Sequence, residues 1–172
     1  MPVPKTEGQL RLCGDYKVTI NPVLEVDQYP LPKPDNIFAT LATGKFFTKI
    51  DLTHAYQQMR LKEDSRDYIT INTHHGLFWY TWLPFGVASA PSVFQKVMDT
   101  VLQGLPKTIC YLDDILISGA TKEEYFHNVE KVLQWLEQYN IHAKKAKCVF
   151  MCDSVGYLGH CIDANGLRTL AS

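Results

Sequence analysis

The sequence lacks the features that mark membrane-spanning, secreted and disordered proteins. No apolar stretch approaches the run of about 18 residues that a bilayer-spanning helix needs. The beginning of the chain, rich in Pro and Lys, lacks the apolar core of a signal peptide, and no low-complexity segment or internal repeat occurs. These absences predict a soluble, intracellular protein without a membrane partner.

The chain also lacks a strong charge of either sign. Its 17 Lys and Arg residues are balanced by 18 Asp and Glu residues, which gives a formal net charge of -1. A nucleic-acid binder usually carries a basic footprint, and the chain as a whole has none. What remains is an ordinary globular composition of 172 residues, 46% hydrophobic and 20% charged, which suits one domain with a real core.

The five cysteines include no Cys-x-x-Cys pair. Because their number is odd and most lie in apolar, strand-like contexts, free thiols in a reducing compartment are favoured over a disulfide framework. Zinc is a minor alternative, since adjacent residues such as His160 and Cys161 would point to opposite faces of one strand. Its ligands would be Cys148, Cys152, His160 and Cys161.

Strand-like and helix-like segments alternate along the chain, which predicts an α+β architecture. Helices are expected from about Asp35, from Ser92 and after Thr121, where Thr121-Lys122-Glu123-Glu124 forms a capping box. The buried stripe of the last helix would comprise Phe126, Val129, Val132, Leu133 and Leu136. Strands are expected at 12–20, 46–50, 146–151 and 155–162, with hairpins at 68–82 and 108–117 and a helix-compatible segment at 52–59.

Two adjacent carboxylates, Asp113 and Asp114, separate two apolar runs and predict a β-hairpin with acidic residues at its turn. Side by side they repel each other, so a divalent cation would stabilise them, although Asp is common in ordinary turns. Asp51 ends another strand, where it could also cap the next turn. A split β-α-β order would bring all three to neighbouring strand ends, where they could hold two cations for in-line phosphoryl displacement.

Five segments stand in order along the chain: Arg11 to Lys17, Phe46 to Met59, Leu83 to Gln95, Tyr111-Leu112-Asp113-Asp114 and Tyr157-Leu158-Gly159-His160. They resemble the successive core motifs of reverse transcriptases, and their residues are most similar to those in the Pol polyproteins of gypsy-type LTR retrotransposons. The resemblance runs over 3–163 and implies a polymerase palm of split β-α-β, ferredoxin-like topology with part of the fingers. Residues of about 1–45 and 60–85 would be fingers-like and about 46–59 and 86–163 palm-like, within a single partial reverse transcriptase domain spanning 1–172.

The resemblance implies an RNA-directed DNA polymerase that adds deoxynucleotides to a primer 3'-hydroxyl on an RNA or DNA template. The metal ligands for two Mg²⁺ ions would be Asp51, Asp113, Asp114 and the main-chain carbonyl of Leu52. The deoxynucleoside triphosphate would be bound by Arg11, Leu52, Tyr56, Phe85 and Gly86, with Tyr56 beneath the sugar to exclude a 2'-hydroxyl. Template or primer would be contacted by Gln95, Tyr111, Leu158 and Gly159.

Taken without the family, some of these residues have simpler interpretations. Arg11 would be a solvated strand charge and Tyr56 a core aromatic. Phe85 stands where many reverse transcriptases have Gln, although Phe is usual in the gypsy-type branch. The family often carries a lysine that protonates pyrophosphate, and the resemblance does not choose among Lys144, Lys145 and Lys147, which could equally form a solvated strand edge.

Two other functions fit the same motifs. The chain could be an inactive, truncated retroelement remnant with at most weak nucleic-acid binding, because the thumb and the later domains of a Pol polyprotein are absent. An RNA-dependent RNA polymerase would share the acidic hairpin, but Tyr56 argues against it. An active element would act in the cytoplasm within a virus-like particle, beside the thumb, RNase H and integrase domains of its polyprotein.

Overall fold

The chain folds into two compact units. The computed structural model describes residues 2–4, 10–12, 14–26 and 28–169, with side chains from residue 14 onward. Unit 1 comprises Met1–Tyr29 and His54–Phe94, and unit 2 comprises Pro30–Thr53 and Gln95–Ser172. None of the described helices is long and apolar enough to cross a membrane.

Unit 2 is built around a four-stranded antiparallel sheet in the order β6-β7-β3-β8. β3 lies beside β7 rather than beside β6, which is the order that a split β-α-β arrangement produces. Among the described strands, β6 and β8 are the outer ones. The strands are β3 (Phe46–Asp51), β6 (Thr108–Tyr111), β7 (Asp114–Gly119) and β8 (Val149–Cys152).

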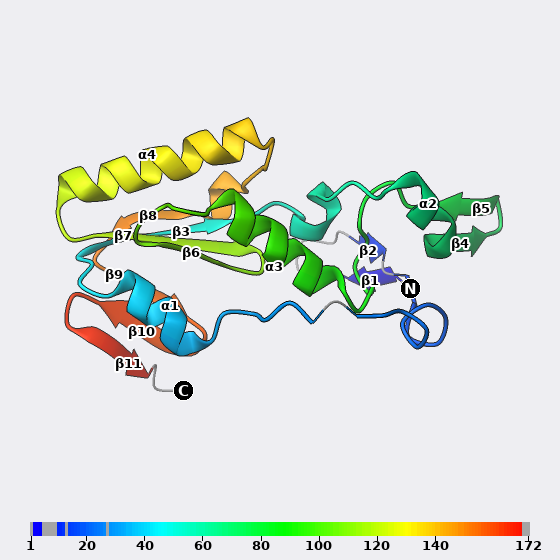
Figure 1. The fold of residues 1–172 in the computed structure, drawn as a ribbon, viewed down its shortest axis with the longest axis horizontal. Coiled ribbons are helices and arrows are strands. Elements are labelled where there is room, and N and C mark those ends of the chain that lie inside the picture. The colour runs from blue at the N-terminus through cyan, green and yellow to red at the C-terminus, as the bar shows by residue number, and fades with distance from the viewer. Residues whose placement is uncertain (1, 5–9, 13, 27, 170–172) are drawn as a thin grey trace. The chain divides into compact units, whose positions relative to one another are not determined.

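Both faces of this sheet are covered within unit 2. Helix α4 (Lys122–Gln138) lies over one face, and helix α1 (Pro34–Leu41) lies with a small sheet against the other (Figure 1). Their apolar side chains leave water, which is the main stabilising term in folding. The small sheet has the order β11-β10-β9, with β9 (Ser154–Tyr157), β10 (His160–Asp163) and β11 (Gly166–Thr169). The core on this side contains Ile37, Leu41, Phe47, Leu116, Val155, Tyr157 and Ile162.

Helix α1 belongs to unit 2, although the resemblance grouped residues 1–45 with the fingers. Its residues Ile37 and Leu41 are fully buried in the same core cluster as Phe47 of β3. This apolar stripe gives the short helix its packing partner in unit 2.

Helix α4 begins as predicted, but its buried stripe is shifted. The Thr121 hydroxyl accepts a hydrogen bond from the Glu124 N–H at 3.2 Å, as a capping box requires. Phe126 and Leu133 are exposed, so those two predictions were wrong, and Tyr125 and Asn128 are buried instead. The Tyr125 hydroxyl lies 2.6 Å from that of Thr48, and the Asn128 amide donates to the Ser118 carbonyl at 2.9 Å. These polar partners in the sheet turn that side of the helix inward.

Four other sequence predictions need correction. The strand expected at 12–20 is replaced after β2 (Leu10–Leu12) by turns, because the N–H groups of Thr19 and Asn21 both donate to the Tyr16 carbonyl. A 3-10 turn over Lys145–Lys147 precedes β8, which shortens the strand expected at 146–151. The strand expected at 155–162 is the hairpin β9–β10, and the helix-compatible segment at 52–59 forms only a 3-10 turn over Ala55–Gln58.

Unit 1 contains the predicted hairpin with His74 and His75 at its turn. Its core cluster joins the loop residue Tyr16 to the segment that leads into helix α3 (Ala90–Val101). The buried members are Tyr16, Ile69, Leu83, Val87 and Ala90. Strand β1 (Pro2–Pro4) of this unit pairs with β2. The other elements are α2 (Glu63–Arg66), the 3-10 turn Asp67–Ile69, β4 (Thr70–Thr73) and β5 (Gly76–Trp79).

Candidate active site

The acidic hairpin predicted from the sequence is β6–β7 of unit 2. Its last strand pair is Tyr111 with Asp114, so Leu112 and Asp113 form a two-residue turn. Leu112 has a φ of 53°, a left-handed backbone conformation that costs a residue other than glycine roughly 1–3 kcal/mol. Surrounding contacts must therefore hold the turn.

Gln95 of helix α3 supplies these contacts. Its side-chain amide is fully buried and donates to the Cys110 carbonyl at 2.8 Å and to the Asp99 carboxylate at 2.8 Å. Its side-chain oxygen accepts from the Leu112 N–H at 3.0 Å. The resemblance predicted that Gln95 contacts the template, but in the structure its amide is committed to the hairpin backbone.

Asp51 lies at the same end of the sheet as the hairpin turn. It is the register partner of Asp114, so two carboxylates stand on neighbouring strands, and the Leu52 N–H donates to the Asp113 carbonyl at 2.8 Å. On the other side, Leu52 forms a bridge with Ala143. This brings Asp51, Leu52, Asp113 and Asp114 together, as the sequence predicted.

The Leu52 carbonyl is directed toward the hairpin. The bridge to Ala143 uses the carbonyls of Asp51 and His142, which accept from the N–H groups of Lys144 and Thr53 at 2.8 Å each. In an antiparallel pair of this kind, the two facing residues send their own N–H and C=O groups away from each other. The Leu52 carbonyl, which was predicted to be a metal ligand, therefore accepts no hydrogen bond in the bridge to Ala143.

Two lysines neutralise the two paired carboxylates. The Lys49 ammonium lies 2.9 Å from Asp114, and the Lys147 ammonium lies 3.3 Å from Asp51. Burial raises the pKa of Asp114, and the charges of Asp113 and Asp51 raise it further, while the hydrogen bond and charge of Lys49 lower it. Lys49 therefore partly offsets the cost of keeping this carboxylate ionised.

The donor chemistry of this cluster suits magnesium, which prefers hard oxygen ligands. Carboxylates and one carbonyl are such ligands, and the two ammonium groups neutralise two of the three carboxylates. In the part of the chain that the structure describes, however, no three His, Cys, Asp or Glu side chains lie close enough together to hold a metal ion without some movement.

The segment predicted to contact the primer is the β9–β10 hairpin. Leu158 and Gly159 form its turn, with φ values of 48° and 76°, and Leu158 is exposed. Next to the turn, the Tyr157 hydroxyl donates to the Tyr111 carbonyl at 3.2 Å, and the two rings meet edge to face with their centroids 6.1 Å apart. This second turn is thus tied directly to the acidic hairpin.

Four of the residues predicted to bind the nucleotide, Arg11, Tyr56, Phe85 and Gly86, lie in unit 1, whereas Leu52 lies in unit 2. The Tyr56 ring contacts those of Phe85 and Phe94, with centroids 5.2 and 5.6 Å away. Gly86 has a φ of 101°, and a Cβ there would lie 2.8 Å from the Gly14 carbonyl, so glycine is needed for packing within the protein itself. Arg11 lies in β2, and its side chain falls outside the described part of the structure.

Sequence reasoning missed three residues of these sites: Lys49, Tyr157 as the link between the two hairpins, and Asn21. The Asn21 side chain donates to the Gly86 carbonyl and accepts from the Ala88 N–H, both at 2.9 Å, which fixes the loop after Phe85. Lys49 could have been found, because residues i and i+2 of a strand share a face and Asp51 follows two positions later. The pairing of Asn21 with a loop so distant in sequence leaves no comparable signal.

Cys110 provides a test of the packing behind the hairpin. Its thiol is buried and donates to the Leu112 carbonyl at 3.2 Å, and its pKa is raised by burial and by the nearby charges of Asp99, Asp114 and Asp113. Since the thiolate is the reactive form, we expect no reaction with a disulfide reagent at pH 8 until the protein unfolds. Thiol titration of native wild-type protein and of Cys110→Ser should give the same count, and one thiol fewer in the variant would contradict this.

The sheet order and the acidic hairpin define a polymerase palm with part of the fingers. The chain matches the family described as reverse transcriptase (RNA-dependent DNA polymerase) over residues 3–162. It therefore belongs to the reverse transcriptase family. A foamy viral protease-reverse transcriptase in complex with double-stranded DNA has a similar fold, with a TM-score of 0.90 at 25% identity over 99% of this chain and 30% of that one.

Curated relatives include retrotransposon polyproteins. The Tf2-3 polyprotein of Schizosaccharomyces pombe is 34% identical over 95% of this chain and 12% of its own length. The uncharacterized protein K02A2.6 of Caenorhabditis elegans is 36% identical over 95% of this chain and 13% of its own length. The chain thus spans about an eighth of the length of these relatives.

Proposed function

We propose that this chain is the palm and part of the fingers of an RNA-directed DNA polymerase that extends a primer with deoxynucleotides. The observation that carries the proposal is the pairing of Asp51 with Asp114 at the sheet end where Asp113 forms the hairpin turn. Membership of the reverse transcriptase family supports the same activity. The remaining domains of a Pol polyprotein would act beside it, as the polyprotein relatives suggest.

The metal ligands in this proposal are Asp51, Asp113, Asp114 and the Leu52 carbonyl. When bound, two Mg²⁺ ions would lower the pKa of the primer 3'-hydroxyl and stabilise the leaving pyrophosphate. Asp113 is the exposed member at the turn, whereas Asp51 and Asp114 are partly buried beside their lysines. The protein's own contribution is to hold these oxygens at one end of a rigid sheet.

Lys147 is the best candidate for the proton donor among the three neighbouring lysines. It forms an ion pair with Asp51, and more than half of its side chain is exposed, so the ammonium can leave Asp51 for an incoming phosphate. In this role Lys147 would donate a proton to an oxygen of the departing pyrophosphate.

The primer terminus would lie against the exposed turn of Leu158 and Gly159, with Tyr111 next to it. The link from the Tyr157 hydroxyl to the Tyr111 carbonyl would keep this turn in register with the acidic hairpin. Gln95 would influence template and primer only through the hairpin that it braces. Structures of the foamy viral enzyme with DNA and with an RNA/DNA hybrid support a template and primer as the partner of this fold.

Deoxynucleotide selection would depend on Tyr56, with Phe85, Gly86 and Arg11 as the other nucleotide contacts. The rings of Phe85 and Phe94 hold Tyr56 in place. We expect Tyr56→Ala to raise the kcat/KM ratio of ribonucleotide to deoxynucleotide incorporation about a hundredfold, because the ring would no longer exclude the 2'-hydroxyl. Single-nucleotide extension assays measure this ratio. Tyr56→Phe keeps the ring and should keep the wild-type ratio, and an unchanged ratio in Tyr56→Ala would disprove the role.

The proposed activity is tested by primer extension on a poly(rA) template with an oligo(dT) primer. Extension should require Mg²⁺ and be stopped by EDTA. An inactive remnant is the second candidate, favoured by the ion pairs in which Lys49 and Lys147 occupy two of the carboxylates. A protein that is folded by circular dichroism yet gives no extension at any Mg²⁺ or Mn²⁺ concentration would establish that candidate.

A further inference from the structure

Lys49 is held from two sides in the middle of the acidic cluster. It lies on β3, two residues before Asp51, and its ammonium is 2.9 Å from Asp114 on the neighbouring strand β7. On its other side the ammonium lies 5.2 Å from the centroid of the Tyr157 ring, within the range of a cation–π interaction. The Tyr157 ring is itself anchored, because its hydroxyl donates to the Tyr111 carbonyl.

The two lysines of the cluster differ in how firmly they are held. Lys49 sits inside the sheet with 27% of its side chain exposed, has an aromatic ring as a second partner, and approaches its carboxylate more closely. Lys147 comes from a 3-10 turn, has 58% of its side chain exposed, and lies 3.3 Å from Asp51. An incoming cation can therefore displace Lys147 more easily than Lys49.

We propose that Lys49 is a positioning residue that serves as a fixed counter-ion for Asp114, so that divalent cations bind mainly through Asp51 and Asp113. This inference rests on the proposed function, because it concerns the metal ions of that reaction. Lys49 also links three strands of the site. It lies on β3, pairs with Asp114 of β7 and contacts the ring of Tyr157 of β9. By occupying Asp114, it lowers the affinity of the empty cluster for a free cation.

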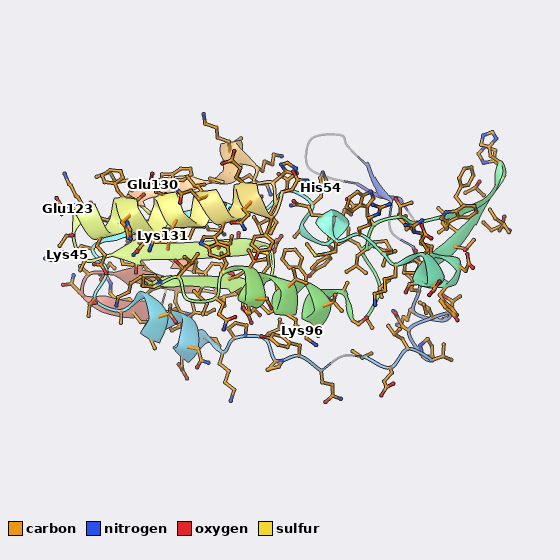
Figure 2. All side chains as sticks on the ribbon, turned by 45° about the horizontal axis from the view of Figure 1, so that its top comes forward. Lys45, His54, Lys96, Glu123, Glu130 and Lys131 are labelled. Carbon is orange, nitrogen blue, oxygen red and sulfur yellow. The ribbon has the colours of Figure 1, made fainter. Side chains whose placement is uncertain are left out.

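The test measures the binding of Mn²⁺ to the 172-residue chain by electron paramagnetic resonance, without nucleotide or primer. Lys49→Met leaves Asp114 without its counter-ion and free to serve as a third carboxylate ligand, so it should tighten Mn²⁺ binding about tenfold. Lys49→Arg keeps the charge and should restore the wild-type affinity. The matched control is Lys45→Met, which makes the same charge change at the exposed position just before β3, at the other end of this strand from Asp51 (Lys45 is labelled in Figure 2).

A double-mutant cycle shows whether Lys49 acts through Asp114. In an Asp114→Asn background, the added Lys49→Met change should alter the Mn²⁺ affinity less than twofold. The same cycle is followed by thermal unfolding. Lys49→Met alone should lower the Tm, because the partly buried Asp114 carboxylate loses its partner, and the double variant should recover most of the loss.

The outcomes separate this inference from the proposed function. Equal Mn²⁺ affinities of Lys49→Met and Lys45→Met, or a full tenfold effect in the Asp114→Asn background, would overturn the role of Lys49 and leave the polymerase proposal intact. If wild-type protein binds no Mn²⁺ up to millimolar concentrations and Lys49→Met does not bind it either, both proposals fail.

Discussion

Asp113→Asn is expected to reduce the rate of primer extension at least about a thousandfold. A metal ion contributes several kcal/mol to the transition state of phosphoryl transfer, and a neutral amide at the hairpin turn would bind it far less well. The side chain is exposed at the turn, so the substitution removes no packing and should leave the fold unchanged. Single-turnover extension with poly(rA) and oligo(dT) measures the loss.

The control for this prediction is Asp153→Asn. Asp153 is an exposed aspartate between β8 and β9, so the variant makes the same chemical change outside the candidate site. It should extend the primer within a factor of two of the wild-type rate. Extension by Asp113→Asn at the rate of this control would exclude the proposed mechanism.

Gln95→Leu should lower the free energy of unfolding by about 2–4 kcal/mol. The substitution keeps the volume of the side chain approximately but leaves the Cys110 carbonyl and the Leu112 N–H without their buried partner, and each such group costs about 1–3 kcal/mol. Urea denaturation, followed by circular dichroism, measures the change. Extension activity should fall as well, because the turn that carries Asp113 loses its support.

The matched variant is Gln134→Leu, on the exposed side of α4. Its side chain has no comparable burial, so its free energy of unfolding should stay within about 0.5 kcal/mol of the wild type. If Gln95→Leu is as stable as this control, the hydrogen bonds from Gln95 do not hold the hairpin.

The sequence was sufficient to predict the acidic hairpin and its neighbour Asp51, because both depend on local patterns. Apolar runs on either side of Asp113 and Asp114 specify the strands, and the strand before Asp51 ends where its apolar pattern ends. The ferredoxin-like strand order then follows from the sequence of elements. These parts of the fold required no knowledge of distant contacts.

The remaining features depend on partners that are distant in sequence. The α4 stripe was misjudged because the hydroxyl of Tyr125 meets Thr48, and hydropathy gives no weight to such a bond. Gln95 looked like a polar residue for a ligand, whereas its partners are the Asp99 carboxylate and main-chain groups at Cys110 and Leu112. Main-chain groups are the same in every residue, so the amino-acid sequence does not reveal which of them a buried side chain will bind.

The position of β8 at the edge of the sheet has a practical consequence. Among the described strands it pairs only with β3, and Val149, Phe150 and Met151 follow one another along it with exposed side chains. An apolar edge strand is a template on which a second chain can add a strand. We therefore expect this edge to be the place where the chain self-associates as its concentration rises, which analytical ultracentrifugation would measure.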